Sequence, residues 1–208
     1  MTTPGLRERK KQELRDRISG VATQLILTRG FEAVSVSEIA AAAGVSRMTV
    51  FNYFARKEDM FLDRLPELTG LIEAGVRGSA TPLAALRDVF LQLLDTRHPL
   101  AGFADRMTYF WQVVIDSPAL RARVREFLEE LEGLVAGLFE EGGQAQPRLT
   151  AALALAAYRV CYVDAAARIM AGEQAESFFD EHRARVTRAF DQAAIGAAAV
   201  EENEGSGR

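Results

Sequence analysis

Apolar residues recur at helical spacing along most of the chain, and after Pro82 no stretch alternates as a β-strand would. A first helix is predicted from about Arg7 to Thr28, because its apolar positions fall on one face: Leu14, Ile18, Val21, Ala22 and Leu25. Gly30 is expected just beyond its end. Later helices are predicted over residues 82–96, 100–115, 117–141, 148–171 and 175–196, with Pro, Gly or short polar residues between them. The pattern predicts an all-α protein of about nine helices.

Two short helices are predicted between the first helix and residue 57. Ser35 precedes Glu38 by three residues, which is the capping-box signal for a helix start. Gly44 is expected to end that helix, since glycine accepts the left-handed backbone angle of a sharp turn. Ser46 is a suitable N-cap for the next helix. Another helix is predicted to begin near Lys57, with Pro66 kinking or interrupting it.

The second short helix has an apolar side, formed by Val45, Val50 and Phe54, and a polar side. The polar side carries residue types that suit a DNA groove. Arginine pairs with guanine and asparagine with adenine at the base edges, while threonine and tyrosine hydroxyls suit phosphates. The alternative is a capped helical hairpin whose polar face is simply solvated.

The run from about Arg9 to Leu62 resembles the N-terminal domain of the TetR family of bacterial transcriptional repressors. The resemblance is carried by Arg29-Gly30-Phe31, Val36-Ser37-Glu38-Ile39-Ala40, Gly44-Val45-Ser46 with Thr49, Phe51-Asn52-Tyr53-Phe54 and Lys57-Glu58. It covers under a third of the chain and implies DNA binding through a helix-turn-helix.

The resemblance also implies roles for individual residues. By position, Arg47, Met48 and Asn52 correspond to base-reading residues. Thr49, Tyr53 and Lys57 correspond to phosphate contacts. Ser35 and Ser37 correspond to positions that meet the DNA backbone or a base edge. The N-cap serine of the second short helix, Ser46, is also assigned to the DNA-binding site. Phe51 stands where the family usually has tyrosine, so one phosphate hydrogen bond is missing and Phe51 is not expected to be a contact.

The charge of the chain is divided by position. The formal net charge is −4, yet residues 1–62 carry +3 and residues 63–208 carry −7. A basic N-terminal part is what a phosphate-binding surface requires. Alone, the basic run at the start would be a solvated face. Beside the helix-turn-helix we expect a mobile arm that touches phosphates or the minor groove, formed by Arg7, Arg9, Lys10 and Lys11.

Composition and motifs exclude several other classes of protein. No apolar run is expected to span a bilayer, no secretory signal is visible, and the single Cys161 fits a reducing compartment, so a cytoplasmic protein is predicted. The two histidines, His98 and His182, lack the spacing of a metal site, and no catalytic motif occurs. We expect no enzyme activity, no metal and no cofactor.

The helix over 148–171 is apolar almost all round, so it must be buried on two sides. One side is expected to face a second protomer, with a fully internal helix in a monomer as the alternative. The resemblance implies a two-fold dimer in which this helix and the last one form a four-helix bundle. The residues assigned to that interface are Leu153, Ala156, Val160, Ala167, Phe179, Val186 and Phe190.

A stripe of aromatic and methionine side chains runs through the C-terminal helices. Such stripes usually form a packed core, and the alternative is an apolar cavity for an apolar or aromatic small molecule. The cavity comes mainly from the resemblance, because that domain of the family binds an inducer. The residues assigned to it are Phe103, Met107, Phe110, Trp111, Phe127, Leu131, Tyr158 and Tyr162.

These inferences predict four segments. Residues 1–56 hold the arm and the helix-turn-helix, 57–78 a connecting helix, 79–197 a ligand-binding and dimerisation domain, and 198–208 a polar, frayed tail. The predicted function is a dimeric repressor that leaves a palindromic double-stranded operator when a small molecule binds. The alternatives are a DNA-binding regulator without an inducer, and a helical-bundle carrier or enzyme with a vestigial helix-turn-helix.

Overall fold

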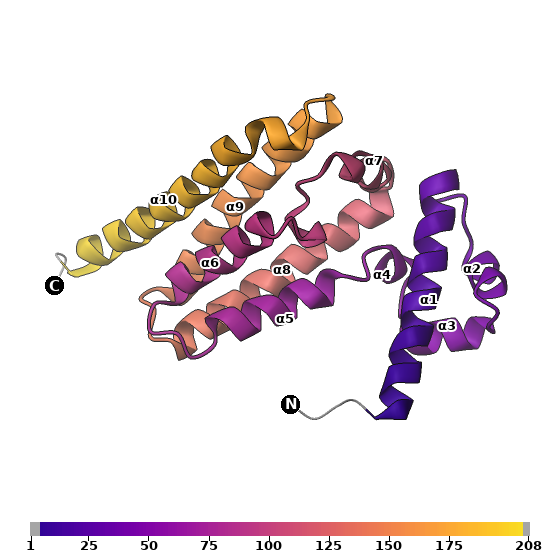
Figure 1. The fold of residues 1–208 in the computed structure, drawn as a ribbon. Helices are drawn as coiled ribbons and strands as arrows, with labels where there is room; N and C mark the ends of the chain where they lie inside the picture. The colour runs from indigo at the N-terminus through magenta and orange to yellow at the C-terminus, as the bar shows by residue number, and fades with distance from the viewer. Residues whose placement is uncertain (1–4, 206–208) are drawn as a thin grey trace. The chain divides into compact units, whose positions relative to one another are not determined.

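The computed structural model describes residues 5–205 of the chain, and side chains as far as residue 199. Over these residues it contains ten α-helices, three short 3-10 helices and no strand, which confirms the all-α prediction (Figure 1). The helices form two compact units. The N-terminal unit comprises the chain up to Asp63 together with Gln112–Arg123, and the C-terminal unit comprises Arg64–Trp111 and the chain from Val124 onward.

The N-terminal unit is built from four helices and the inserted segment. They are α1 (Leu6–Arg29), α2 (Val36–Ala42), α3 (Arg47–Tyr53) and α4 (Lys57–Phe61). α1 packs against α2 and α4, and α2 packs against α3. The core between them is fully buried and includes Ile18, Ile26, Ile39, Val50 and Met60. Each such side chain contributes roughly 1.5–3 kcal/mol to stability, so four short elements can hold a fixed arrangement.

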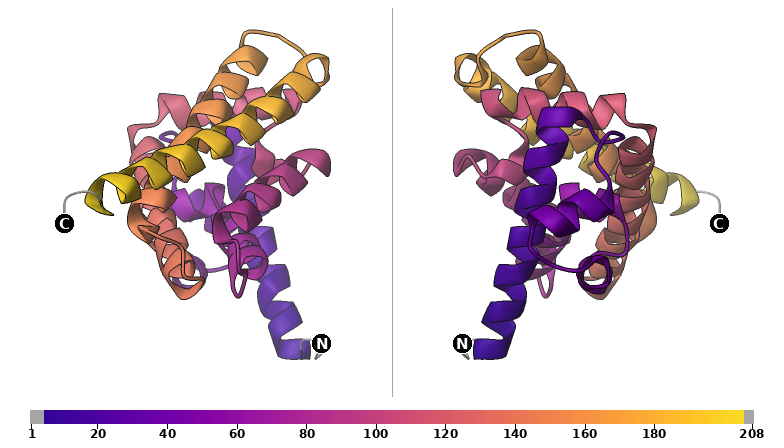
Figure 2. Two further views of the ribbon diagram at one scale, coloured as in Figure 1. Left: turned by 90° about the vertical axis from the view of Figure 1, so that its left-hand side faces the viewer. Right: turned by 90° about the vertical axis from the view of Figure 1, so that its right-hand side faces the viewer.

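The C-terminal unit is built mainly from five helices. They are α5 (Leu65–Val76), α6 (Pro82–Asp95), most of α8 (Pro118–Glu141), α9 (Pro147–Met170) and α10 (Phe179–Gly205). α9 and α10 run side by side, as Figures 1 and 2 show, and α6 packs against both. The buried core includes Leu86, Phe90, Val135, Phe139 and Val186.

Pro66 interrupts the connecting helix, one of the two outcomes that the sequence predicts. α4 ends at Phe61, and Pro66 lies in the first turn of α5. A proline fits there because the first backbone N–H groups of a helix have no partner in that helix. The chain therefore passes from one compact unit to the other through a break between two helices.

The helix predicted over 100–115 is shorter than expected. Pro99–Ala101 and Asp105–Met107 form single 3-10 turns, and α7 spans Thr108–Asp116. Gly102 has a left-handed φ of 65°, and Ala104 is extended. Helical spacing of Phe103 and Met107 with later residues suggested a continuous helix, but the left-handed glycine ends the first turn before a second can form.

The last helix is longer than predicted. A 3-10 turn at Ala175–Phe178 leads into α10, which continues to Gly205. Gly196 was expected to end it, but it lies within the helix, where an added Cβ would be 3.4 Å from Leu153 Cδ1 of α9. The glycine therefore serves close packing of two helices, and the alanines around it favour helix. The predicted frayed tail, 198–208, is helical to Gly205, and its last three residues lie outside the described part.

α9 also differs from expectation in one respect. By length and composition alone it could cross a membrane, whereas no apolar run is expected to do so from the sequence. It packs along α10, and several of its side chains, including Ala151, Ala154 and Cys161, lie in the core of the C-terminal unit. Core helices pass the same compositional test, so this helix is weak evidence for a membrane.

Candidate functional site

The turn between α2 and α3 is fixed by the predicted capping signals. Ser35 Oγ accepts a hydrogen bond from the Glu38 backbone N–H at 3.2 Å, and Glu38 Oε2 accepts one from the Ser35 N–H at 2.9 Å. That backbone bond, the Ser35 hydroxyl and Arg29 together lower the pKa of Glu38 to about 2. Gly44 has the left-handed φ of 66° that the turn needs. The capping box and the glycine turn are therefore both confirmed.

α3 is anchored on one side and open on the other. Ser46 Oγ accepts from the Thr49 N–H at 3.0 Å, which confirms the predicted N-cap. Val50 and Phe54 are buried in the core of the N-terminal unit. Arg47, Met48, Phe51 and Asn52 are exposed. The open side of α3 thus presents a guanidinium, an amide and two apolar side chains to solvent.

Two cations hold α3 and α4 in place from inside the unit. Arg15 of α1 donates a 2.8 Å hydrogen bond to the carbonyl of Tyr53, and its guanidinium carbon lies 4.2 Å from the centre of the Phe54 ring. Lys57 Nζ donates to the carbonyls of Phe31 and Val34 at 2.8 and 3.0 Å. Cations suit the last carbonyls of a helix, so Arg15 positions the end of α3.

The structure places the predicted DNA contacts as follows. The exposed ones are Ser35, Ser37, Ser46, Arg47, Met48 and Asn52, and the half-buried ones are Thr49, Tyr53 and Lys57. The Ser35 and Ser46 hydroxyls serve as caps, and the Lys57 ammonium is bonded to two carbonyls. The arm residues lie exposed in the first turns of α1, not in a separate extended arm: Arg7, Arg9, Lys10 and Lys11.

A segment distant in sequence completes the N-terminal unit. Ser117, which is 2% exposed, donates from Oγ to Glu32 Oε1 at 2.9 Å. Arg123 Nε donates to Asp59 Oδ1 of α4 at 2.8 Å. Both partners on the later segment lie within Gln112–Arg123, where α7 ends and α8 begins. Sequence reasoning missed these contacts, because no local pattern links positions 64 to 85 residues apart.

The C-terminal unit holds a cluster of aromatic rings. Trp111 meets Tyr162 edge to face with centroids 4.9 Å apart, and Phe110 meets Trp111 in the same way at 5.3 Å. Tyr158 stacks on Phe90 at 3.9 Å. Among the described residues, Trp111 Nε1 is the one buried side-chain donor or acceptor without a hydrogen-bond partner. An unpaired buried N–H costs about 1–3 kcal/mol, so it marks a place where an acceptor would be favourable.

The two tyrosines of this cluster are partly buried. Burial raises the pKa of the Tyr158 and Tyr162 hydroxyls, so both stay neutral. Gly102 approaches the Tyr162 ring closely, since an added Cβ would lie 2.4 Å from its Cε2 atom. The cluster is therefore apolar with neutral hydrogen-bonding groups, and the backbone at Gly102 packs against its edge.

The residues predicted to form one cavity differ in their ring contacts, but four of them share the core of the C-terminal unit: Phe103, Phe127, Leu131 and Tyr158. Phe110, Trp111, Tyr158 and Tyr162 form the cluster just described. Phe103 packs against Phe178, Phe179 and the stacked ring of His182, and Phe127 and Leu131 are buried in the core. Met107 is partly buried.

The residues predicted for a dimer interface also divide. On α9, Val160 is 52% exposed, and Ala156 and Ala167 are exposed as well. Leu153 and Phe179 are partly buried. Val186 and Phe190 are at most 2% exposed and belong to the core of their own protomer. The exposed Val163 and Ile195 extend the apolar surface and were not assigned to it.

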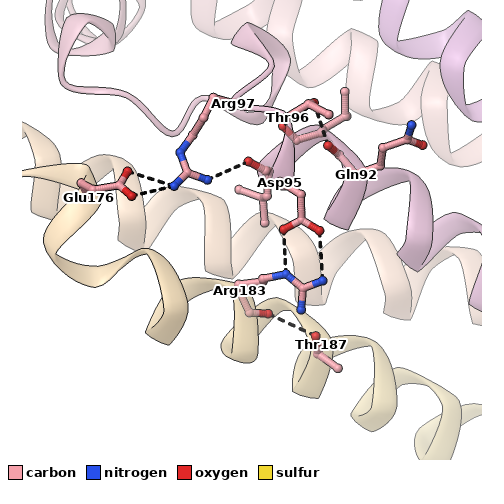
Figure 3. Close-up of polar contacts among 9 residues, drawn as sticks. Gln92, Asp95, Thr96, Arg97, Glu176, Arg183 and Thr187 are labelled. Atoms are coloured by element: carbon pink, nitrogen blue, oxygen red, sulfur yellow. Dashed lines mark hydrogen bonds and ion pairs between the residues drawn. The ribbon is translucent and has the colours of Figure 1, made fainter.

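Ion pairs join the end of α6 and the residues just after it to α10 and to the 3-10 turn that precedes α10, as Figure 3 shows. Asp95 accepts two hydrogen bonds from Arg183 at 2.7 and 3.0 Å, and Arg97 bonds both oxygens of Glu176. Arg97 has a left-handed φ of 52° and stacks on Phe179 at 3.4 Å. These contacts lie on the surface of the C-terminal unit and hold its helices together. The described residues contain no group of three or more histidine, cysteine, aspartate or glutamate side chains that could hold a metal ion.

A small N-terminal helical unit with an open α3, together with a larger helical unit, defines the class of helix-turn-helix proteins with an additional all-helical domain. The family profile described as bacterial regulatory proteins of the tetR family matches residues 18–63. The match covers α2, α3 and α4 entirely, so this part of the chain is similar to the N-terminal part of that family.

Relatives support the same assignment. The HTH-type transcriptional regulator TcmR of Streptomyces glaucescens is 29% identical over 161 residues, 73% of this chain and 63% of TcmR. The chain thus spans less than two thirds of that relative's length. TcmR and the matching family profile are described as regulators, which supports at family level the expectation that this chain is no enzyme.

Solved structures share the fold. NalD, the secondary repressor of the MexAB-OprM multidrug efflux pump in Pseudomonas aeruginosa, aligns with a TM-score of 0.57 and 19% identity, over 86% of this chain and 97% of NalD. SmeT in its complex with triclosan aligns with a TM-score of 0.60 and 14% identity, over 88% and 91%. At such identities the likeness concerns the fold alone.

Proposed function

We propose that this protein is a dimeric DNA-binding transcriptional regulator of the cytoplasm. The observation that carries the proposal is the open side of α3, where Arg47 and Asn52 are exposed on a helix that caps and a glycine turn hold rigidly. A rigid helix with arginine and asparagine on its open side suits base edges in the major groove. Exposed basic residues at the start of α1 would add phosphate contacts.

The dimer is proposed from the apolar surface of α9. Val160, Val163, Ala156 and Ala167 are exposed on this helix, and Ile195 is exposed on the neighbouring α10. Small side chains among them allow two helices to approach closely. Two protomers would supply two recognition helices, which a palindromic operator requires about 34–36 Å apart or a multiple of that. Val186 and Phe190 take no part in this proposal, because they are buried within the protomer.

The effector site is proposed at the aromatic cluster of the C-terminal unit. Its rings suit an apolar or aromatic molecule, and the unpaired Trp111 Nε1 would donate to an acceptor on that molecule. Such a site gains affinity from apolar contact and orientation from one or two polar groups. The triclosan complex of SmeT, a protein of the same fold, makes a small aromatic ligand a reasonable first probe.

We propose that the effector releases the protein from DNA by moving α7 and α8, the two helices that have residues in both units. Ser117 and Arg123 bond to Glu32 and Asp59, and each lies on a helix or helix start that continues into the C-terminal unit. A shift of these helices would reach α4, which begins at Lys57, and change the spacing of the two recognition helices. A coupling free energy of about 1–3 kcal/mol is typical of such systems.

DNA binding is tested by selecting duplexes from a random-sequence library and measuring affinity for the selected duplex at several salt concentrations. Arg47→Ala is expected to lose about 1–3 kcal/mol of binding free energy if Arg47 reads a guanine. Arg148→Ala, an exposed arginine on the C-terminal unit, is the matched control and is expected to bind normally. Wild-type affinity of Arg47→Ala would contradict the proposal.

The effector is tested with a library of small aromatic compounds, including triclosan, read by the fluorescence of Trp111, the only tryptophan in the chain. A compound that quenches Trp111 is expected to weaken binding to the selected duplex. DNA binding that no quenching compound alters would favour the regulator without an inducer.

A further inference from the structure

Two apolar side chains lie on the open side of α3. Met48 is 70% exposed and Phe51 is 43% exposed, although Val50 and Phe54 of the same region are buried. Single exposed apolar residues are common on protein surfaces. Here, however, two of them occupy a seven-residue helix whose other exposed side chains have the chemistry of base recognition.

The spacing of these residues makes one continuous surface. Met48 and Phe51 are three positions apart, so they are neighbours on the helix. Phe51 is four positions from Arg47, and the Arg47 guanidinium carbon lies 6.0 Å from the centre of its ring. Asn52 is four positions from Met48. The apolar pair therefore adjoins a cation and an amide, and all four face away from the buried side of α3.

Each neighbour suits one group in a major groove. Arginine pairs with guanine, asparagine pairs with adenine, and the apolar group that the groove offers is the 5-methyl of thymine. A phosphate backbone offers nothing to Met48 or to a phenylalanine ring without a hydroxyl. Covering an exposed thioether and an aromatic edge with methyl groups removes apolar surface from water on both partners.

We infer that Met48 and Phe51 are specificity-determining residues that read thymine methyl groups in the operator half-site, next to the bases that Arg47 and Asn52 read. This inference rests on the proposed DNA-binding function and deepens it. Phe51, which the sequence alone does not predict to be a DNA contact, becomes a base-contacting residue. The half-site is then expected to contain T·A pairs beside the guanine or adenine that the polar residues select.

The experiment replaces thymine by uracil, which lacks the methyl but keeps every hydrogen-bonding group. The full-length protein is titrated with the duplex selected from the random library and with copies that carry deoxyuridine at one thymine at a time. Removal of a buried methyl is expected to weaken binding about fourfold at each contacted thymine. Substitution outside the half-sites is expected to leave affinity unchanged.

Variants assign the methyl contacts to side chains. Met48→Ala and Phe51→Ala should each become insensitive to uracil at the thymine that they contact, while keeping the salt dependence of binding. Leu27→Ala, which truncates an apolar residue of α1 that is 41% exposed, is the control and should keep the wild-type uracil penalty. Circular dichroism of each variant checks that the helices remain folded.

The outcomes separate the two proposals. Equal affinity for thymine and uracil duplexes at every position would overturn the inference and leave DNA binding intact. The same conclusion would follow if uracil weakened binding of both alanine variants as much as it weakens binding of the wild type. Failure to enrich any duplex, with no salt-dependent binding, would overturn the proposed function and this inference together.

Discussion

Replacing His182 with phenylalanine is expected to remove most of the dependence of protein stability on pH between 5 and 7.5. His182 is 5% exposed, and its ring stacks on Phe103 with centroids 4.7 Å apart and an angle of 11°. Burial, together with the nearby positive charges of Arg185 and Arg168, lowers the pKa of His182 to about 4. Glu181 acts in the opposite direction but does not outweigh them.

The size of the effect follows from proton linkage. The unfolded chain binds a proton at this histidine below about pH 6.5, whereas the folded chain does so only below about 4. The folded pKa is the lower one, so stability is fully present above pH 6.5 and is lost as the pH falls toward 4. At pH 5 the expected loss, relative to pH 7.5, is about 2 kcal/mol.

The assay is urea unfolding at pH 7.5 and pH 5, followed by the fluorescence of Trp111, which lies in the same C-terminal unit. His182→Phe keeps an aromatic ring beside Phe103 and should show little change of unfolding free energy between the two pH values. Four carboxylates have lowered pKa values and titrate below this window: Glu38, Glu67, Asp95 and Glu173. His98→Gln controls for the other histidine. A wild-type pH dependence in His182→Phe would refute the reasoning.

Three further perturbations test other parts of the structure. Gly102→Ala should lower the free energy of unfolding by about 1–3 kcal/mol in urea titrations, since its Cβ would meet the Tyr162 ring and its φ is left-handed; wild-type stability would contradict that close approach. Ser35→Ala should cost about 1 kcal/mol of the same quantity through loss of the capping box, and an unchanged urea midpoint would show that the box contributes nothing. Val160→Glu should shift the protein toward monomer in analytical ultracentrifugation without altering helix content; an unchanged sedimentation coefficient would remove α9 from the proposed interface.

The N-terminal helices could be predicted from the sequence because their signals are local. Ser35 with Glu38, Gly44 and Ser46 lie within a few residues of the backbone groups that they satisfy. The first helix follows from the helical spacing of its apolar residues, and the interruption of the connecting helix follows from Pro66 itself. Such features depend on the chain's own geometry and little on what packs around it.

The functional roles of individual side chains were harder to predict, because they depend on distant partners. Lys57 was assigned to DNA, and its ammonium is bonded to the carbonyls of Phe31 and Val34. Arg15, which fixes the end of α3, gave no signal in the sequence of α1. Burial of Val186 within its own protomer also requires knowledge of which helix face meets α9.

The turns between residues 99 and 107 show another limit. The apolar spacing there is compatible with a helix, yet Gly102 ends a 3-10 turn with a left-handed φ and lies close to the Tyr162 ring. Gly196 shows the reverse case, a glycine that looked like a helix end and lies within α10. The position of a glycine in the sequence therefore does not show whether it forms a turn or allows two helices to pack closely.

The N-terminal unit is not one contiguous piece of the gene product, and this bears on how the protein can be engineered. A fragment that stops at Asp63 would lack Ser117 and Arg123, and with them the groups that bond Glu32 and Asp59. A hybrid sensor that joins residues 1–63 to an effector domain from another protein would therefore have an incomplete N-terminal unit. A working graft would also have to include residues 112–123. The two helices of the recipient that correspond to α7 and α8 would then have to be replaced in part, with the junctions placed at equivalent helical turns. The part to transfer is therefore a set of residues that pack together, not one continuous segment.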